Sequence, residues 1–139
     1  MDHCVFCLIE RGDAPASVVY EDESVLAFLD LQPINEGHTL VIPRHHALGL
    51  ADLEDDTGAR MFGVARRIAA ALRRSPLRCE GVNLFLADGE AALQEVLHAH
   101  LHVVPRWSGD GLTIDAGPVP DVTREQLDDH AEAIRSALS

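Results

Sequence analysis

The stretch "EVLHAHLHVVPRW" (residues 95–107) places His98, His100 and His102 at every second position of an otherwise apolar run. Such a run favours an extended strand. Successive side chains of a strand point to opposite faces, so we expect the three imidazoles to share one face, about 6.6 Å apart. Packing alone does not explain three such rings in a row, and the pattern therefore predicts a functional site.

Composition narrows the class of protein. The chain has 139 residues, 47% of them hydrophobic, which predicts a single domain over residues 1–139 with its own core. A net charge of −12 argues against a nucleic-acid polymer as partner, although a small nucleotide remains compatible. The sequence has no apolar run long enough to predict a membrane-spanning helix. Three cysteines and an N-terminus without a signal-peptide pattern favour a cytoplasmic location.

The order of short strands and helical patterns predicts an antiparallel α+β domain. Apolar residues recur at helical spacing from about Leu53 to Arg74, and Thr123 with Gln126 forms a capping-box pattern before a last helix that ends near Leu138. We expect strands at residues 18–21, 25–29, 38–43 and 81–87, and a fifth in the histidine-rich segment.

A second group of potential ligands lies at the N-terminus. Cys4 and Cys7 have the C-x-x-C spacing of a tetrahedral zinc site, which needs two further ligands. His45 or His46, after the third expected strand, and His98 could complete a Cys₂His₂ set across the fold. A redox pair or two buried thiols would show the same spacing.

The three histidines allow two kinds of chemistry. They could hold a catalytic zinc ion with an open position, or one neutral imidazole could attack phosphorus as a nucleophile. Asp30, at the end of a predicted strand, could bind ribose hydroxyls or merely form a turn. His38 begins the next strand, and Gln94 precedes the triplet.

With these features the chain resembles the histidine-triad family, whose signature alternates three histidines with apolar residues and ends in two apolar residues. The residues from His98 to Val104 match it. The stretches "CVFCLIERGDAPASVVYEDESVLAFLD", "GHTLVIPRHH" and "HVVPRWSGDG" extend the resemblance over residues 4–112. Residues 113–139 carry no motif of the family.

The resemblance implies a fold and an activity. The fold has about five antiparallel strands and two helices, and two copies pair into a ten-stranded sheet as a homodimer. The activity is hydrolysis or transfer of a purine nucleotide at the α-phosphorus of a phosphoramidate or dinucleoside polyphosphate, through a nucleotidyl–histidine intermediate.

The resemblance also implies roles for individual residues. His100 would be the nucleophile, with His102 beside the α-phosphate and His38 in the same cluster. Asp30 would contact ribose, and the nucleotide site would also include Phe28, Leu31 and Gln94. A structural zinc ion would be held by Cys4, Cys7, His46 and His98.

The chain departs from the family pattern ahead of the triad. Ala87 stands where many members have a polar amide, and Leu93 stands where they have glycine. Loss of an amide donor at a phosphate site would weaken transition-state binding. A nucleotide-binding or partner-binding module with weak or no turnover, and a zinc hydrolase using the triad as metal ligands, therefore stay open as alternatives.

Overall fold

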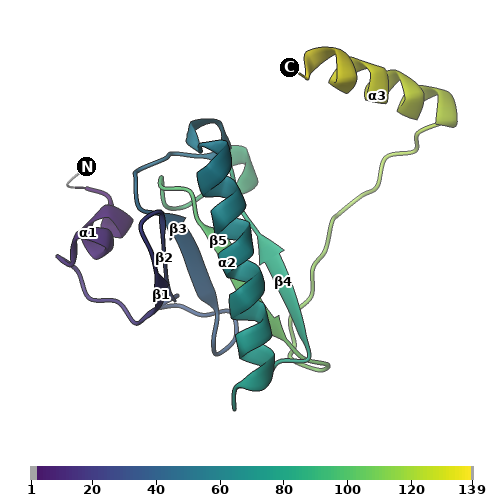
Figure 1. The fold of residues 1–139 in the computed structure, drawn as a ribbon. Coiled ribbons are helices and arrows are strands. Elements are labelled where there is room, and N and C mark those ends of the chain that lie inside the picture. The colour runs from purple at the N-terminus through teal and green to yellow at the C-terminus, as the bar shows by residue number, and fades with distance from the viewer. Residues whose placement is uncertain (1–2, 139) are drawn as a thin grey trace.

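A five-stranded antiparallel sheet forms the centre of the protein, whose computed structural model describes residues 3–138 (Figure 1). The strand order is β1-β2-β3-β5-β4, so β1 and β4 are the two edges. The predicted antiparallel α+β fold is confirmed. The strands are β1 (Val18–Glu21), β2 (Val25–Leu29), β3 (Thr39–Pro43), β4 (Gly81–Phe85) and β5 (Leu101–Arg106).

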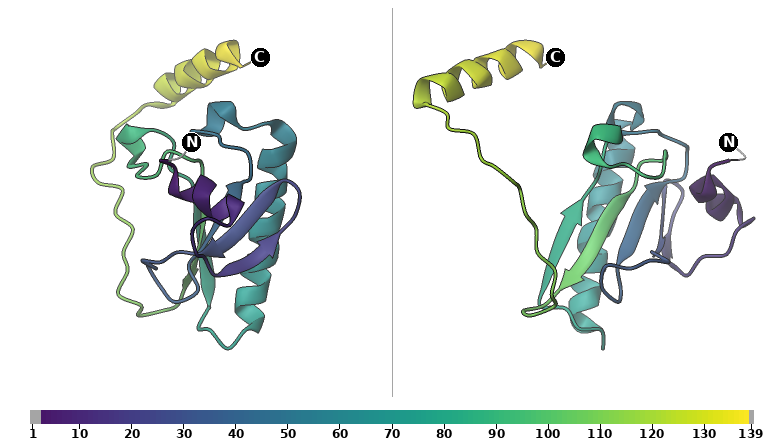
Figure 2. Two further views of the ribbon diagram at one scale, coloured as in Figure 1. Left: turned by 90° about the vertical axis from the view of Figure 1, so that its left-hand side faces the viewer. Right: turned by 180° about the vertical axis from the view of Figure 1, so that it is seen from behind.

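Each face of the sheet has its own hydrophobic core. Side chains alternate between faces along a strand, so Val25 and Ala27 of β2 face one core while Leu26 and Phe28 face the other. The first core packs against α2 (Asp55–Arg74), which runs along one side of the sheet (Figure 2). The second is closed by Phe6 of α1 (Val5–Arg11).

Helix α2 follows the sequence prediction closely. Met61, Val64, Ala65 and Leu72 recur at helical spacing and are buried against the sheet. Arg73 and Arg74 occupy the last turn, where cations interact favourably with the helix dipole. The capping Ser75 ends the helix just before a proline in the sequence.

Helix α1 is a third helix that the sequence did not predict. It has seven residues, too few to show a helical period, and its first turn carries the C-x-x-C pair. Cys4 is the N-cap, and its Sγ accepts a hydrogen bond from the Cys7 backbone N–H at 3.4 Å. Gly12 ends the helix at φ 82°, a conformation that favours glycine.

The histidine-rich segment is a strand only in its second half, so the prediction of a continuous strand was wrong there. Strand β5 begins at Leu101; His98 lies in a bend, and His100 directly precedes the strand. The chain leaves the ladder because Ala99 N–H donates to the Ala47 carbonyl oxygen at 2.7 Å, in the loop after β3. The rings of His100 and His102 still lie side by side, with centroids 4.8 Å apart.

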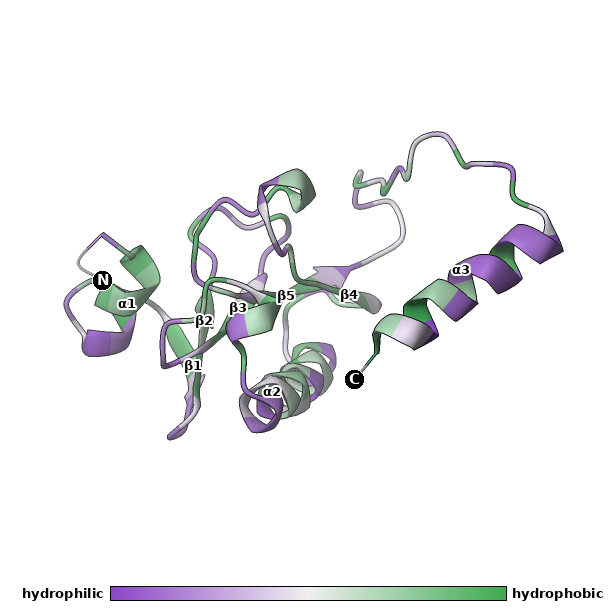
Figure 3. Cartoon of the chain, turned by 90° about the horizontal axis from the view of Figure 1, so that it is seen from above, coloured by the Kyte–Doolittle hydropathy of each residue, from purple (hydrophilic) through white to green (hydrophobic). Residues whose placement is uncertain are grey.

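The predicted C-terminal helix is present as α3 (Arg124–Ala137), and both hydrogen bonds of the capping box between Thr123 and Gln126 are formed. Residues 112–123 contain neither helix nor strand and carry α3 beyond the β4 edge (Figures 1 and 2). Hydropathy drawn on the chain shows mostly hydrophobic strands and a largely hydrophilic α3 (Figure 3). Within residues 3–138, no helix is both long and apolar enough to cross a membrane.

Candidate functional site

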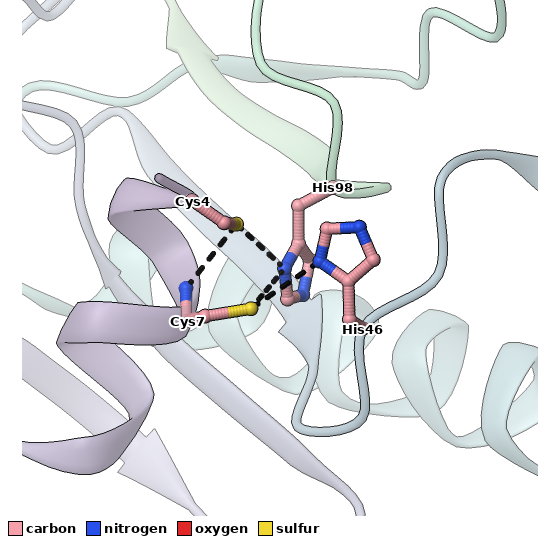
Figure 4. Close-up of side chains that lie close together, drawn as sticks. All are labelled: Cys4, Cys7, His46 and His98. Atoms are coloured by element: carbon pink, nitrogen blue, oxygen red, sulfur yellow. Dashed lines mark hydrogen bonds between the residues drawn. The ribbon is translucent and has the colours of Figure 1, made fainter. Parts of the chain in front are cut away.

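Two cysteines and two histidines meet at the start of α1 (Figure 4). Cys7 comes from α1 and Cys4 caps its N-terminus, while His46 comes from the loop after β3 and His98 from the bend before β5. Their donor atoms all lie within 4.8 Å of one another. The structure therefore brings together all four residues expected to bind zinc, whereas the neighbouring His45 is exposed.

The spacing of these atoms fits a tetrahedral metal ion. Donor atoms around a tetrahedral zinc ion are separated by about 3.3–3.8 Å. Cys4 Sγ lies 3.3 Å from His98 Nδ1, and Cys7 Sγ lies 3.2 Å from His46 Nδ1 and 3.6 Å from His98 Nδ1. The chemistry of the donor set, two sulfurs and two imidazole nitrogens, is that of a structural zinc site.

The surroundings of Cys7 oppose ionisation of its thiol when no cation is bound. Burial and the adjacent Cys4 raise the pKa of the Cys7 thiol to about 11. A thiolate there needs a nearby positive charge at neutral pH. A divalent ion would neutralise both thiolates, as a buried site requires.

His98 has the protonation state that metal binding needs. Its Nε2 lies 2.9 Å from the Pro43 carbonyl oxygen and must donate, because a carbonyl only accepts. The lone pair of a neutral His98 is therefore on Nδ1, the atom that faces both cysteines. A backbone carbonyl is a common outer partner of zinc-bound imidazole.

His100 is oriented by the backbone next to it. Its Nδ1 lies 2.8 Å from the His98 carbonyl oxygen and must donate to it. In the neutral ring this leaves Nε2 with a free lone pair, which is what a nucleophile requires. The ring of Phe6 contacts His100 edge-on at a centroid distance of 5.1 Å and helps to hold it.

His38 and His102 form a chain of hydrogen bonds across β3 and β5. The Ile34 backbone N–H donates to His38 Nδ1 at 3.0 Å, so the proton of neutral His38 is on Nε2. That proton is donated to His102 Nδ1, 2.9 Å away. The remaining nitrogen of His102, Nε2, therefore carries a proton and can donate to a ligand.

Burial keeps the rings of His38 and His102 neutral. It lowers the pKa of His38 against the opposing effect of Asp30, and it lowers the pKa of His102 to about 4 together with the rings of His100 and His38. At neutral pH the assigned tautomers therefore apply.

The protonation of these histidine rings argues against a catalytic zinc ion held by the triad. Donor atoms of Asp30, His38 and His102 also lie within 4.8 Å of one another. His38 Nε2 holds a proton, however, and cannot bind a metal while Nδ1 accepts from Ile34. His98 directs one nitrogen to the cysteines and the other to Pro43, so the geometry does not support a zinc hydrolase in which all three triad residues share one ion.

The residues expected to bind nucleotide are dispersed. Asp30 Oδ2 lies 3.7 Å from His38 Nε2, and its Oδ1 accepts from the Gln32 backbone N–H. The expected base-pocket residues differ in exposure: Phe28 is buried at 3% against Phe6, whereas Leu31 is 86% exposed.

Gln94 holds a loop together. Its side-chain amide donates to the carbonyl oxygens of Leu48 and Val96, and its Oε1 accepts from the Gly89 backbone N–H. The adjacent Leu93 has φ 66° and is the one non-glycine residue with positive φ among residues 3–138. Leu93, which stands where many family members have glycine, therefore has a backbone conformation that favours glycine.

Two aromatic residues contact the histidines of the site although the sequence analysis did not predict them as site residues. Phe85 stacks on His102 with ring centroids 4.1 Å apart and planes 13° apart, and Phe6 contacts both His98 and His100. Phe85 directly opposes His102 in the β4–β5 ladder, a register that alternation along one strand does not reveal. Phe6 lies on α1, the helix that was not predicted.

The HIT domain family matches residues 11–109 of the sequence. The chain belongs to the HIT family. A solved HIT family structure from Bacillus subtilis has a TM-score of 0.90 and 35% identity, covering 99% of this chain and 98% of that one, so the match includes α3. This agreement confirms both the resemblance to the family and the fold.

Two further relatives bear on chemistry. A Zn-bound histidine triad family protein from Mycobacterium smegmatis has a TM-score of 0.78 and 45% identity over 99% of both chains. The adenosine 5'-monophosphoramidase of Saccharomyces cerevisiae is 35% identical over 124 residues, 89% of this chain and 75% of the relative. The HIT relatives of this chain thus include a nucleotide hydrolase and a zinc-bound protein.

Proposed function

We propose that this HIT protein hydrolyses purine nucleoside phosphoramidates at the α-phosphorus, with His100 as the nucleophile. The observation that most supports this proposal is the 2.8 Å hydrogen bond from His100 Nδ1 to the His98 carbonyl oxygen, which leaves Nε2 free to attack. The yeast relative, an adenosine 5'-monophosphoramidase, supports the substrate class. Transfer to another acceptor and cleavage of a dinucleoside polyphosphate would use the same first step.

In that step His100 Nε2 forms a bond to phosphorus, and the bond from phosphorus to the leaving nitrogen breaks. The leaving nitrogen takes a proton from solvent water and departs as an amine. The ring of His100 becomes positively charged. The His98 carbonyl oxygen, already 2.8 Å from its Nδ1–H, stabilises that charge. His102 Nε2–H would donate to a phosphoryl oxygen.

In the second step a water molecule bonds to phosphorus and releases a proton to the solvent, which balances the proton taken up in the first step. The phosphorus–nitrogen bond to His100 breaks, and the free nucleotide leaves a neutral imidazole behind. Asp30 would bind the ribose hydroxyls of the nucleotide. Asp88 and Glu90, in the segment ahead of the triad, would repel the additional charge of a polyphosphate, so we expect a phosphoramidate to be preferred.

We propose that the Cys₂His₂ group binds a structural zinc ion. Cys4, Cys7, His46 and His98 would hold it, and its contribution would be to fix α1 and the bend at His98 against the sheet. With all four positions filled by protein, no position is left for water or substrate.

The nucleophile is tested with the variant His100→Ala. We expect turnover of adenosine 5'-phosphoramidate to fall by at least about a thousandfold, because among His38, His100 and His102 only His100 has a ring lone pair that accepts no hydrogen bond. The matched control His130→Ala, on α3, should keep full activity. Wild-type enzyme quenched at alkaline pH should carry an acid-labile nucleotide label that His100→Ala lacks.

Undiminished turnover by His100→Ala would contradict the mechanism. A wild-type protein that binds AMP yet releases nucleoside monophosphate from neither a phosphoramidate nor a dinucleoside polyphosphate would instead favour the binding-module alternative.

We also propose a homodimer formed through the β4 edge. The edge strand Gly81–Phe85 contains neither a charged residue nor a proline, the usual means of protecting an edge. Antiparallel pairing of two β4 strands would give the ten-stranded sheet that the family resemblance implies. Sedimentation of the full chain over a range of concentrations tests this, and a monomer throughout would contradict it.

A further inference from the structure

A groove lies between α2 and the first three strands, on the face of the sheet that α2 covers. Its volume is about 590 Å³, within the range of about 300–1,000 Å³ that is typical of small-molecule sites. Val19, Leu29 and Thr39, one from each of β1, β2 and β3, form one wall. Helix α3 stands beyond the opposite edge strand β4 (Figure 1), and no residue from 112 to 138 lines the groove.

The other wall of the groove is one side of α2 together with its C-cap. Its residues recur at helical spacing and therefore lie above one another along the helix: Val64, Arg67, Ile68, Ala71, Arg74 and Ser75. Ala71 is in the middle of this row, and its small side chain leaves room between the helix and the strands.

The hydroxyl groups of the lining are already used within the protein. The side chains of Tyr20, Thr39 and Ser75 all donate hydrogen bonds to other groups of the chain. Apart from Arg67 and Arg74, the remaining lining residues are apolar or glycine. The groove therefore offers a ligand an apolar surface and two guanidinium groups.

Arg67 and Arg74 are the charged residues of the lining. They are two helical turns apart, which separates their Cα atoms by about 10 Å along the axis of α2. Within residues 3–138, neither has a carboxylate partner and no Asp or Glu lines the groove, although the net charge of the chain is −12. This lining favours a negatively charged ligand.

The acid nearest in sequence to this wall does not compete for Arg67. The Arg67 guanidinium lies 5.2 Å from the centre of the Tyr20 ring, and the Tyr20 hydroxyl donates to Asp22. Asp22 is paired with Arg60 at 2.7 Å. The charge of Asp22 is therefore balanced without Arg67, which keeps its own charge for a ligand.

We propose that the groove binds an aliphatic dicarboxylate, with one carboxylate on Arg67, the other on Arg74, and the methylene chain on the apolar surface between them. Decanedioate has the required length, because nine single bonds of about 1.5 Å span about 11 Å in an extended chain. The chain and the charges have different tasks. Burial of the methylene groups contributes most of the affinity, whereas two exposed ion pairs contribute less and select the anion.

The groove and the histidine cluster lie on opposite faces of the sheet. Val64 belongs to the core under α2. His102 directly opposes Leu40 in the β3–β5 ladder, and Leu40 belongs to the core closed by Phe6. The proposed ligand site is therefore independent of the proposed catalysis, and AMP should not displace decanedioate.

Isothermal titration calorimetry of the full chain tests the ligand class. Decanedioate should bind with a stoichiometry of one per chain. Decane-1,10-diol has the same chain without charge, and butanedioate has the two charges on a chain too short to reach both arginines. Each should bind at least about fivefold more weakly than decanedioate. Equal binding of the diol would overturn the assignment of an anion site.

The arginines are tested with a pair of double variants. Arg67→Gln/Arg74→Gln should weaken decanedioate binding by at least about fivefold. The matched control Arg66→Gln/Arg73→Gln removes the same charge from α2 at residues that do not line the groove, and should bind as the wild type does. An equal loss in both variants would show a response to net charge alone and would overturn the pairing.

The location is tested by filling the groove. Ala71→Trp should weaken decanedioate binding by at least about tenfold, whereas Arg66→Trp, at an exposed position of α2 outside the groove, should not change it. Thermal melts of both variants check that the fold is kept. Binding that persists in a folded Ala71→Trp variant, or that AMP abolishes, would place decanedioate elsewhere and overturn the proposal, as would the absence of binding to the wild type at millimolar concentration.

Discussion

The carbonyl oxygen of His98 accepts a 2.8 Å hydrogen bond from Nδ1 of His100, so the backbone of a candidate zinc ligand orients the candidate nucleophile. The His98 ring is held in turn by Pro43 on one side and the two cysteines on the other. Disturbing the cysteines should therefore move His100 without removing it.

Replacing Cys4 with serine should release the metal, lower the melting temperature by at least about 5 °C and reduce kcat more than it raises KM. The cause is that α1 and the His98 bend lose their common anchor while the nucleotide contacts remain. Elemental analysis, thermal melts and steady-state kinetics measure the three effects.

The control for that variant is Cys79→Ser, because Cys79 lies outside the four-residue group and donates to the Gly81 carbonyl oxygen. It should retain the metal. A metal-free wild type with equal stability and activity would show that Cys4 and Cys7 are only buried thiols. Loss of activity on metal removal without loss of stability would favour a catalytic zinc.

Replacing Leu93 with glycine should stabilise the fold by about 0.5–1 kcal/mol. Leu93 has φ 66° and is 82% exposed, so glycine relieves the unfavourable backbone conformation and loses little packing. Urea denaturation measures the gain. The comparison is Leu97→Gly, exposed but without positive φ, which should lose stability; a loss at both positions would refute the argument.

Replacing Phe85 with alanine should lower kcat by about two- to thirteenfold, because the stack of its ring on His102 is worth about 0.5–1.5 kcal/mol. KM and metal content should change little. Phe85→Tyr should restore the rate by keeping the stack, and Phe62→Ala, at an exposed site on α2, should leave it unchanged. An unaltered rate in Phe85→Ala would mean that the stack does not position His102.

The stability of the protein should fall as the pH drops from about 6.5 to about 4. Burial, with the rings of His100 and His38, lowers the pKa of His102 from 6.5 to about 4, so the unfolded chain takes up a proton before the folded one does. The variant His102→Gln should reduce the slope of the unfolding free energy by up to about 1.4 kcal/mol per pH unit in this range.

Urea melts of both proteins at constant zinc concentration, from pH 7.5 to pH 4.5, would measure the slopes. Any effect of pH on the metal ligands is shared by the two proteins and cancels in the comparison. Identical slopes would show that His102 does not carry the predicted shift.

The sequence by itself determined the class of fold and most element positions, and it singled out the candidate site residues. Strand and helix periods are local, so β1 to β3, α2 and the capping box of α3 could be read from neighbouring residues. The spacing of His98, His100 and His102 and the C-x-x-C pair are likewise local patterns.

Only the tertiary structure decided how those side chains are oriented. Contact with Pro43 and the two cysteines turns Nδ1 of His98 toward Cys4 and Cys7, while Ile34 and His102 fix the proton of His38. These partners come from distant segments, and no local period encodes them. The same is true of the Phe85 stack and of the groove between α2 and the sheet, because register and burial depend on what the rest of the chain brings into contact.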